Sequence, residues 1–480
     1  MAATVTPIAP SRYDGFTTMP LGGHWRAGCS GKIATDADPW SGAILTEIPL
    51  AGADDLDEAY AVAERAQRAW AAQPPTRRAD VMRAAASVLE ARRDEVTDWL
   101  IHETGAPVAA AGLEWNQARE AVLAAAALPH QIIGAIVPSD LPGRQTRVCR
   151  APAGVVAVIS PACFPLRLSS RTTAAALAAG NAVVLKPSSD TPVTGGLLLA
   201  KIFREAGLPA GLLSVVIASG AEVSEAITGH RVPSVISFAG SAAVGRILVR
   251  HCGAKRLVGQ PGTDGPLVVL EDADLARAAD AAVFGSFAGH DQICMITRRI
   301  TVHRKVYAEF TDRLLALAGC LRAGDPAAAD TDIGPVGSAR RLTAVRDAVE
   351  RARAEGARQV LGGEPDGPAR LLLPAHVLLA RDNVASTREE LAGPVITIVR
   401  ARDERDALRI ANETGYGRSS AVFTGDIERG TRVALRLNAA MTHVNEAAVN
   451  GEATDDRSSG RVIGDLTAEH WVSVPLRAGP

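Results

Sequence analysis

The order of apolar and polar residues predicts a helical beginning of the chain. Between residues 54 and 100 apolar side chains recur every three or four positions, and two adjacent prolines interrupt the pattern, which predicts two amphipathic helices. Gly105 is suited to end the second of them, and a third helical pattern follows at residues 112–128. Residues 131–148 combine strand-forming residues with turn-forming prolines and glycine, which predicts a β-hairpin.

After the hairpin, short apolar runs alternate with helical patterns. The predicted strands lie at residues 155–160, 182–185, 213–217 and 235–238. The predicted helices lie at residues 170–179, 195–206 and 222–228. Fully apolar strands joined by helices form parallel sheets with right-handed crossovers. A second alternating region covers residues 257–444, and a last strand is predicted at residues 470–474. The pattern therefore predicts an α/β protein.

Composition excludes several classes of function. The chain has 480 residues, 47% of them hydrophobic, so it can bury a large core. Its net charge of -2 provides no basic excess, and we expect no nucleic-acid partner. The six cysteines are scattered without C-x-x-C spacing, which favours a reducing, cytoplasmic location. We see neither a signal-peptide pattern at the start nor an apolar run that could span a bilayer, and expect no membrane partner.

Two positions after predicted strands are candidates for nucleotide binding. Residues 238–245, FAGSAAVG, follow a strand and begin a helix, where backbone N–H groups and the helix dipole favour a phosphate. Lys186 follows another buried strand, at the edge where parallel sheets bind ligands. Each has a simpler explanation when taken alone, a plain turn or a surface lysine. Their presence in one predicted sheet favours a nucleotide site.

Cys294 is the candidate nucleophile. It lies in an apolar run, where a cysteine most often packs in a core. It becomes reactive only at a helix start or beside a base. The local sequence leaves both interpretations open.

These segments together resemble the aldehyde dehydrogenase superfamily over nearly the whole chain, with most similarity to its bacterial benzaldehyde and vanillin dehydrogenase branch. The matching segments are GVVAVISP (154–161), GNAVVLKP (180–187), SFAGSAAVG (237–245), QICM (292–295), EELAGPV (389–395) and ANETGYG (411–417).

The resemblance implies the aldehyde dehydrogenase fold, with a doubly wound parallel-sheet cofactor domain, an α/β catalytic domain and a small β oligomerisation arm. The expected bounds are 1–130 and 149–256 for the cofactor domain, 257–463 for the catalytic domain, and 131–148 and 464–480 for the arm. The resemblance also implies NAD or NADP as cofactor and a homodimer or homotetramer.

It further implies a role for each matching residue. Cys294 attacks the aldehyde, while in the family an asparagine and a backbone N–H hold the oxyanion, NAD(P)+ accepts hydride and a glutamate activates water. Lys186 contacts the adenosine ribose, Ser241 the pyrophosphate and Glu390 the nicotinamide ribose. Ser189 stands where NAD-preferring members often carry glutamate, so we expect NADP to be tolerated. The remaining implied cofactor positions are Ser160, Pro161, Gly220, Gly240 and Val244.

The residues that depart from the family pattern occupy positions that the family uses for catalysis. Cys163 replaces the oxyanion asparagine, and Gln260 replaces the general-base glutamate. Beside the nucleophile Gln292 is retained, but Asp291 replaces a glycine. Losing an oxyanion donor costs about 10²–10³ in rate, and losing a general base costs about 10²–10⁴. Glutamine cannot accept a proton from water, and a thiol is a weak donor.

Two hypotheses therefore stand. In the first, the chain is an NAD(P)-dependent oxidoreductase that uses Cys294 on an aldehyde or thioester and passes the acyl group to an acceptor other than water. In the second, it is a non-redox biosynthetic enzyme or an inactive binding protein on the same scaffold. Ala162 and Ala392 replace a tryptophan and a phenylalanine of the family pattern, which widens the pocket and predicts a bulkier small-molecule substrate.

Cys163 and Cys294 are expected to be neighbours, because both family positions converge on one carbonyl. A disulfide between them requires Cα atoms about 4.4–6.8 Å apart. Two unlinked thiols are the alternative that a reducing compartment favours.

Overall fold

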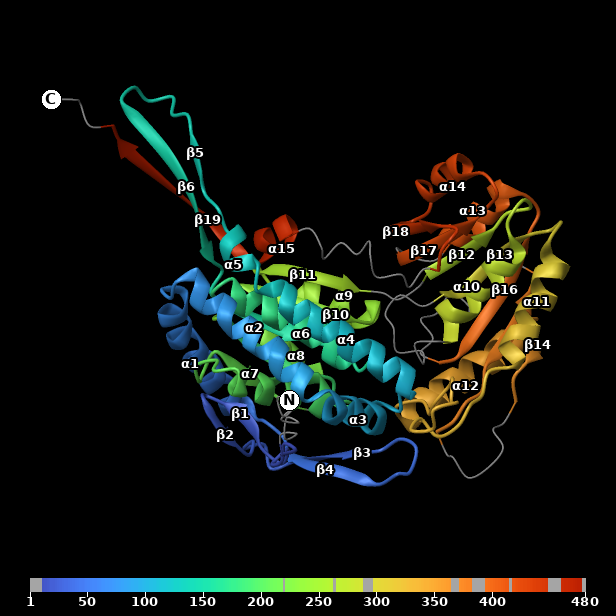
Figure 1. Cartoon of the computed structure of the whole chain (residues 1–480), viewed down its shortest axis with the longest axis horizontal. Helices are drawn as coiled ribbons and strands as arrows, with labels where there is room; N and C mark the ends of the chain where they lie inside the picture. The colour runs from blue at the N-terminus through green and yellow to red at the C-terminus, as the bar shows by residue number, and fades with distance from the viewer. Residues whose placement is uncertain are drawn as a thin grey trace, which may run out of the picture.

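The computed structural model describes residues 11–218, 221–261, 265–287, 297–363, 371–381, 393–413, 417–447 and 459–476. It contains two α/β lobes and a three-stranded arm that projects from the first lobe (Figure 1). The first lobe is built on a five-stranded sheet and the second on a seven-stranded sheet. Both sheets are mainly parallel, which confirms the predicted α/β class.

The sheet of the first lobe has the strand order β11-β10-β7-β8-β9, and all its pairs are parallel. Its strands are β7 (Val155–Ile159), β8 (Ala182–Lys186), β9 (Leu213–Val215), β10 (Val235–Gly240) and β11 (Arg256–Pro261). The chain enters at the central strand β7, moves outward to β9, and returns to the other side of β7 with β10. The order therefore reverses between β7 and β10, and ligands of such sheets bind at the carboxyl ends of the strands beside this point.

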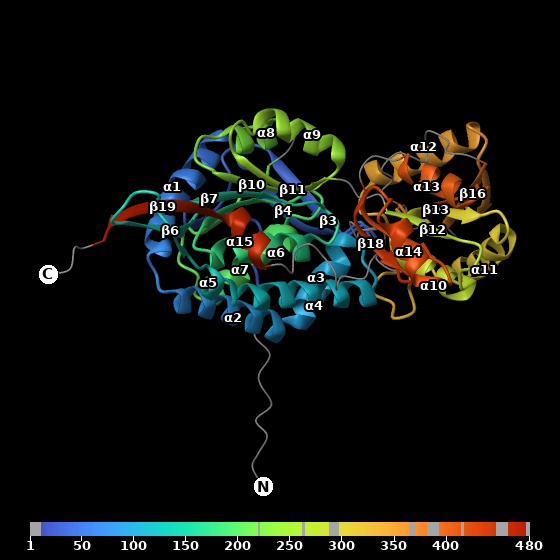
Figure 2. The same cartoon turned by 90° about the horizontal axis from the view of Figure 1, so that it is seen from above.

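Helices cover both faces of this sheet, which is why β7, β8 and β9 are buried along their whole length. Helices α8 and α9 lie on one face, α6 and α7 lie on the other, and α2 and α4 form a further layer outside α6 (Figure 2). The helices of the lobe are α1 (Ala53–Ala71), α2 (Pro75–Ala91), α3 (Arg93–Thr104), α4 (Val108–Ala125), α5 (Leu128–Gln131), α6 (Pro165–Ala178), α7 (Leu198–Glu205), α8 (Ala221–Gly229) and α9 (Ala242–His251), with a π-helical turn (Val193–Leu197) before α7.

Two differences between the predicted and observed helices have a clear physical cause. The run predicted over residues 78–100 is two helices, because Arg92 leaves the helical conformation and its guanidinium binds Glu95 and Glu205, each at 2.8 Å. Helix α6 begins at Pro165, five residues before the predicted start at residue 170, because proline fits the first helical position. The predicted glycine cap is confirmed, since Gly105 ends α3 with a φ of 76°.

Two short hairpins precede α1, where the sequence pattern predicts no strand. They consist of β1 (Met19–Leu21), β2 (His24–Arg26), β3 (Ile33–Ala37) and β4 (Ile44–Pro49).

The seven-stranded sheet of the second lobe has the order β14-β15-β16-β13-β12-β17-β18, and only β14 is antiparallel to its neighbour. Its strands are β12 (Gly265–Val269), β13 (Thr297–His303), β14 (Arg358–Leu361), β15 (His376–Ala380), β16 (Val395–Ala401), β17 (Gly417–Phe423) and β18 (Ala439–Val444). Its helices are α10 (Leu275–Phe287), α11 (Tyr307–Gly319), α12 (Ala339–Ala354), α13 (Glu404–Asn412) and α14 (Ile427–Ala434).

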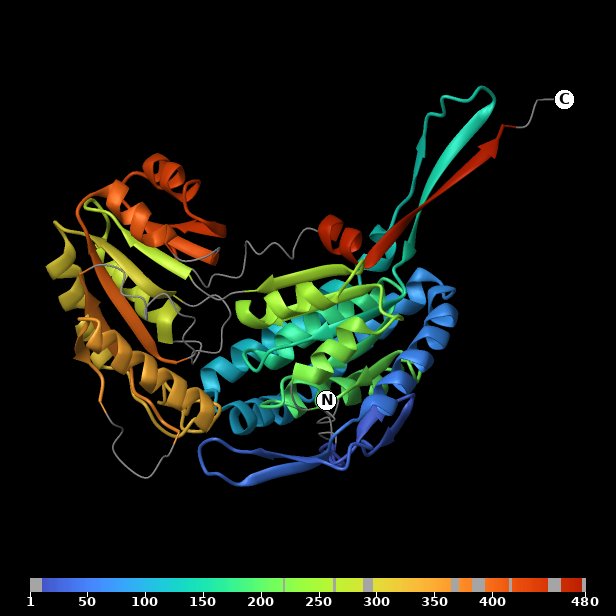
Figure 3. The same ribbon diagram turned by 180° about the vertical axis from the view of Figure 1, so that it is seen from behind.

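The arm joins segments far apart in the sequence. Strands β5 (Ala135–Val137) and β6 (Arg144–Pro152) form the predicted hairpin, and β19 (Thr467–Pro475) pairs antiparallel with the whole of β6. Seen from behind, the arm extends away from both lobes (Figure 3).

The first lobe takes in more of the chain than expected. Strand β11 extends its sheet past residue 256, where we placed the end of the cofactor domain, because residues 256–261 pair in parallel with β10. Helix α15 (Ser459–Leu466), expected within the catalytic domain up to residue 463, instead packs on α5 and α6. None of the helices in the described ranges has both the length and the apolar character needed to cross a bilayer.

Candidate active site

Four neighbouring strands bring the candidate residues to one edge of the first sheet. Lys186 is the last residue of β8, and its register partner on β7 is Ile159, next to Ser160. On the other side of β7, Gln260 of β11 pairs with Ala239 of β10. The backbone therefore places the Lys186, Ser160 and Gln260 positions at the carboxyl ends of three strands on one edge of the sheet, as the βαβ pattern predicts for Lys186.

Lys186 fits the ribose-binding role implied by the resemblance. Its side chain is buried, and burial lowers its pKa while the negative charge of Asp190 acts in the opposite direction. An ammonium group has three N–H donors, and among the described residues one acceptor is present, the Pro187 carbonyl oxygen at 3.3 Å. The remaining donors suit ribose hydroxyl groups.

The start of α9 fits a phosphate. Ser241 caps the helix, and its Oγ accepts a hydrogen bond from the backbone N–H of Val244 at 3.4 Å. A Cβ on the preceding residue, Gly240, would lie 2.7 Å from the Phe238 ring, so a larger residue there would require the ring to move. The side chain of Val244 is 39% exposed in the first turn of the helix and presents an apolar surface. Helix dipole and N–H groups favour an anion at this end.

Cys163 lies in the turn between β7 and α6, where the two lobes meet. It packs with Ala239 and with Met441 of β18 against Phe164 and Leu168. Phe164 has a φ of 44°, in the left-handed region, so the turn is tight and its geometry is unusual for a side chain of this size.

The turn is held by a carboxyl group from a neighbouring helix. Glu114 of α4 accepts hydrogen bonds from the backbone N–H groups of Leu166 at 2.8 Å and Arg167 at 3.2 Å. Burial raises the pKa of Glu114 to about 8, although these N–H groups and the Arg167 charge act to lower it. Helix α4 thus satisfies two of the open N–H groups at the start of α6, the helix that follows Cys163.

The structure gives fewer contacts for the other predicted site residues. Ser160 is buried, and its Oγ accepts a hydrogen bond from Ser169 at 2.8 Å. Pro161 is half-buried and Ser189 is exposed. Four predicted site residues lie outside the described ranges: Gly220, Gln292, Cys294 and Glu390. Because Cys294 is among them, its pairing with Cys163 stays a prediction.

A cavity of about 940 Å³ extends from this edge of the sheet. Its wall includes Ser160, Ala239 and Gly259 at the strand ends and side chains of α4, α6 and α15. The volume lies near the upper end of the range for small-molecule sites. The predicted helix omits Arg167 and Leu168 of this wall because it begins five residues too late, and Pro165 is the signal that would have placed them. Arg171, Thr172 and Ala175 lie within the predicted helix, but its sequence pattern does not show which face borders a cavity.

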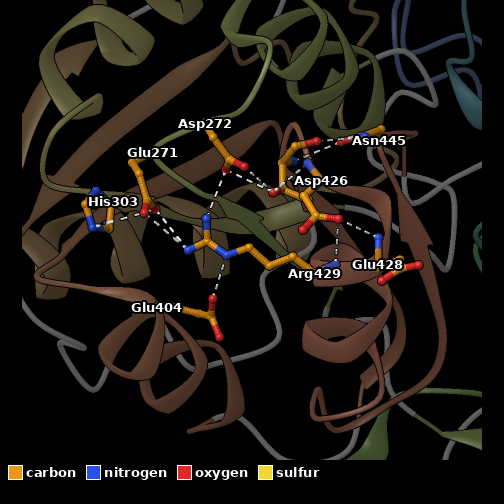
Figure 4. Close-up of polar contacts among 9 residues, drawn as sticks. Glu271, Asp272, His303, Glu404, Asp426, Glu428, Arg429 and Asn445 are labelled. Atoms are coloured by element: carbon orange, nitrogen blue, oxygen red, sulfur yellow. Dashed lines mark hydrogen bonds and ion pairs between the residues drawn. The ribbon is translucent and has the colours of Figure 1, made fainter.

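A second polar cluster lies in the other lobe and has a structural role (Figure 4). The guanidinium of Arg429 on α14 binds Glu404 at 2.8 Å, Glu271 at 3.1 Å and Asp272 at 3.3 Å. Asp426 caps α14 by accepting from the backbone N–H groups of Glu428 and Arg429. Because the cluster's carboxylates have cationic or N–H partners, these contacts tie α13 and α14 to the end of β12.

The fold and the edge residues define a dinucleotide-binding α/β enzyme with a second α/β lobe beside the cofactor site. Comparison with known proteins identifies the family. The model of the aldehyde dehydrogenase family matches residues 25–460. The chain is 38% identical over 469 residues to a vanillin dehydrogenase from Corynebacterium glutamicum, covering 95% of this chain and 96% of that one.

Solved structures agree with this assignment. An NAD-dependent benzaldehyde dehydrogenase from Corynebacterium glutamicum superposes with a TM-score of 0.89 at 38% identity, covering 95% of this chain and 98% of that one. PnpE in complex with nicotinamide adenine dinucleotide superposes with a TM-score of 0.92 at 30% identity, covering 97% and 98%. The chain belongs to the aldehyde dehydrogenase family, within the benzaldehyde and vanillin dehydrogenase branch, and the predicted resemblance is confirmed. Its relatives are named as aldehyde dehydrogenases, which supports assignment to the NAD(P)-dependent oxidoreductases.

Proposed function

We propose that this protein oxidises an aldehyde through Cys294 and releases the acyl group by an atypical route. The observation that carries the proposal is the composition of the sheet edge. The cofactor positions Lys186 and Ser241 keep residues suited to ribose and phosphate, whereas the base position holds Gln260 and the oxyanion position holds Cys163.

The chemistry divides among these residues as follows. The Cys294 thiolate forms a bond to the carbonyl carbon, and the electron pair of the C=O bond moves to oxygen. The bound nicotinamide cofactor supplies the acceptor for the hydride that leaves this carbon, and the carbonyl reforms as a thioester. Cys163 offers only a weak S–H donor to the oxyanion, so the backbone N–H groups of the site carry more of its stabilisation.

Release of the acyl group is the atypical step. The amide of Gln260 cannot accept a proton from water, so attack by water on the thioester is slow. An amine or a coenzyme A thiol is a stronger nucleophile than water and forms an amide or a new thioester while the Cys294 thiolate departs. An acceptor of this kind restores turnover without a general base.

NADP is proposed to be accepted beside NAD. Ser189 is exposed and neutral, so it does not repel a 2′-phosphate as a glutamate would.

The second candidate function is a non-redox or purely binding role on the same scaffold. The replacements at Cys163 and Gln260 favour it, because they remove both groups that the family uses on the carbonyl. The cofactor-site residues Lys186 and Ser241, which are retained, disfavour this second function.

We also propose that the protein is a homodimer or homotetramer that assembles through its arm. The arm exposes apolar side chains, with Ile136 67% and Trp471 61% exposed, on a sheet that projects from the lobes (Figure 1). Exposed apolar surface of this kind marks interfaces. Sedimentation velocity is expected to show two or four chains per particle, and a monomer at micromolar concentration contradicts the proposal.

The first test is titration of the purified protein with NAD+ and NADP+ by calorimetry, followed by intact-mass analysis after incubation with benzaldehyde and the bound cofactor. We expect micromolar binding of at least one cofactor and a benzoyl adduct on the chain. Cys294→Ala is expected to keep cofactor binding and to lose the adduct, because the nucleophile is gone. Cys320→Ala, which removes an exposed thiol at the end of α11, is the matched control and is expected to keep both. The proposal is contradicted if neither NAD+ nor NADP+ binds at millimolar concentration, or if the adduct still forms on the Cys294→Ala variant.

A further inference from the structure

The wall of the cavity is cationic on the side formed by α6. Arg167 and Arg171 both line it, one helical turn apart. Residues spaced by four lie on the same face of a helix, about 6 Å apart along its axis. Cys163 lies in the turn just before α6, and Arg167 lies in the first turn of that helix, so this pair begins near the oxyanion position and extends away from it.

The guanidinium of Arg167 is half-buried and has no ion-pair or hydrogen-bond partner among the described residues. The Arg167 backbone N–H is the group that binds Glu114. Glu114 itself is a poor counterion, because its burial favours the neutral carboxylic acid near pH 7.

The other charged groups of the wall have contacts of their own. Glu120 of α4 accepts a hydrogen bond from Asn116 at 3.2 Å. Arg171, Arg461 of α15 and Asp465 each take part in further interactions. The described wall thus has three arginines and two carboxylates, Glu120 and Asp465, and Arg167 is the group with capacity for an added anion. A guanidinium binds a carboxylate with two parallel hydrogen bonds.

We propose that Arg167 binds a carboxylate at the far end of the substrate, and that the substrate is therefore an aldehyde that carries its own negative charge. This proposal rests on the proposed function, because it assumes that the reacting carbonyl lies beside the turn that holds Cys163, which joins the wall residues Ser160 and Arg167 in the chain. An aromatic ring with an aldehyde and a carboxylate on opposite sides is a molecule of this class. Arg171 adds positive potential on the same face.

Binding of an inert probe tests the proposal without requiring catalysis. The probes are 4-(hydroxymethyl)benzoate, which carries the carboxylate, and its neutral methyl ester. Calorimetry with the full-length protein, with and without saturating NADP+, measures the dissociation constant of each. We expect the carboxylate to bind at least tenfold more tightly than the ester, as charge-assisted hydrogen bonds allow. Arg167→Leu is expected to remove the preference, and Arg167→Lys to retain part of it, since lysine keeps the charge without the planar fork.

The control is Arg65→Leu, which removes an exposed arginine of α1 outside the cavity wall and is expected to leave the preference unchanged. Equal binding of ester and carboxylate to the wild-type protein, or a preference that survives Arg167→Leu, overturns the proposal. Failure of the proposed function can be distinguished from failure of this proposal. The first shows as absence of the adduct on Cys294, whereas the second shows in the separate measurement of probe binding.

Discussion

Gln260→Glu is expected to raise the steady-state rate of aldehyde oxidation in water by about 10²–10⁴-fold, the usual contribution of a general base. The backbone of residue 260 is at the carboxyl end of β11, in register with Ala239, at the edge that also bears the cavity wall. A carboxylate at this position can take a proton from water and let it attack the thioester. Glutamine has the same length but no basic oxygen near neutral pH.

The measurement is NAD(P)H formation under steady-state conditions, together with the amplitude of a first-turnover burst. In the wild-type protein we expect a burst of reduced cofactor followed by slow turnover, because acyl release limits the cycle. In Gln260→Glu the slow phase accelerates and the burst amplitude changes little. Gln73→Glu, at an exposed position just beyond α1, is the matched control and leaves both phases unchanged. If Gln260→Glu leaves the slow phase as it was, the missing base is not what limits hydrolysis.

Cys163→Asn is expected to raise the rate of the burst itself by about 10²–10³-fold, the effect of one oxyanion-hole donor. The amide N–H donates a stronger hydrogen bond than a thiol to the oxygen that becomes charged when Cys294 attacks. The tight turn at Phe164 and the Glu114 contacts to α6 hold residue 163 in place, so the substitution is expected to preserve the turn.

Rapid-mixing measurement of the first turnover separates this effect from acyl release. Cys163→Ala is the control, because it removes the thiol without adding a donor, and we expect it to leave the burst slow. A faster burst in the alanine variant would show that the thiol itself inhibits, for instance through a disulfide with Cys294. Thiol titration under oxidising and reducing conditions checks that alternative directly. The double variant with Gln260→Glu is expected to gain less than the product of the two effects, since groups of one site are not additive.

The predictable part of the fold follows from local patterns. The strands β7, β8 and β10 are mostly apolar runs, and the residues at their carboxyl ends, Lys186 and Ser241, were placed at one edge by the rule that parallel strands point the same way. Gly105 was found as a helix end because a left-handed residue is needed there. The four strands before α1 were not found, since they are only three to six residues long and leave no clear periodic signal.

The sequence by itself determined the family, the parallel sheet, the candidate cofactor edge and the replacements at Cys163 and Gln260, because each depends on residue identity or on spacing along the chain. The tertiary structure decided which side chains form the cavity. Arg167 lines it because α6 starts at Pro165, where Glu114 from another helix satisfies its first N–H groups. Helix α15 closes the same wall from a position nearly 300 residues later in the chain. Contacts between distant segments have no periodicity in the sequence, so only the folded chain reveals the charge that a substrate would meet.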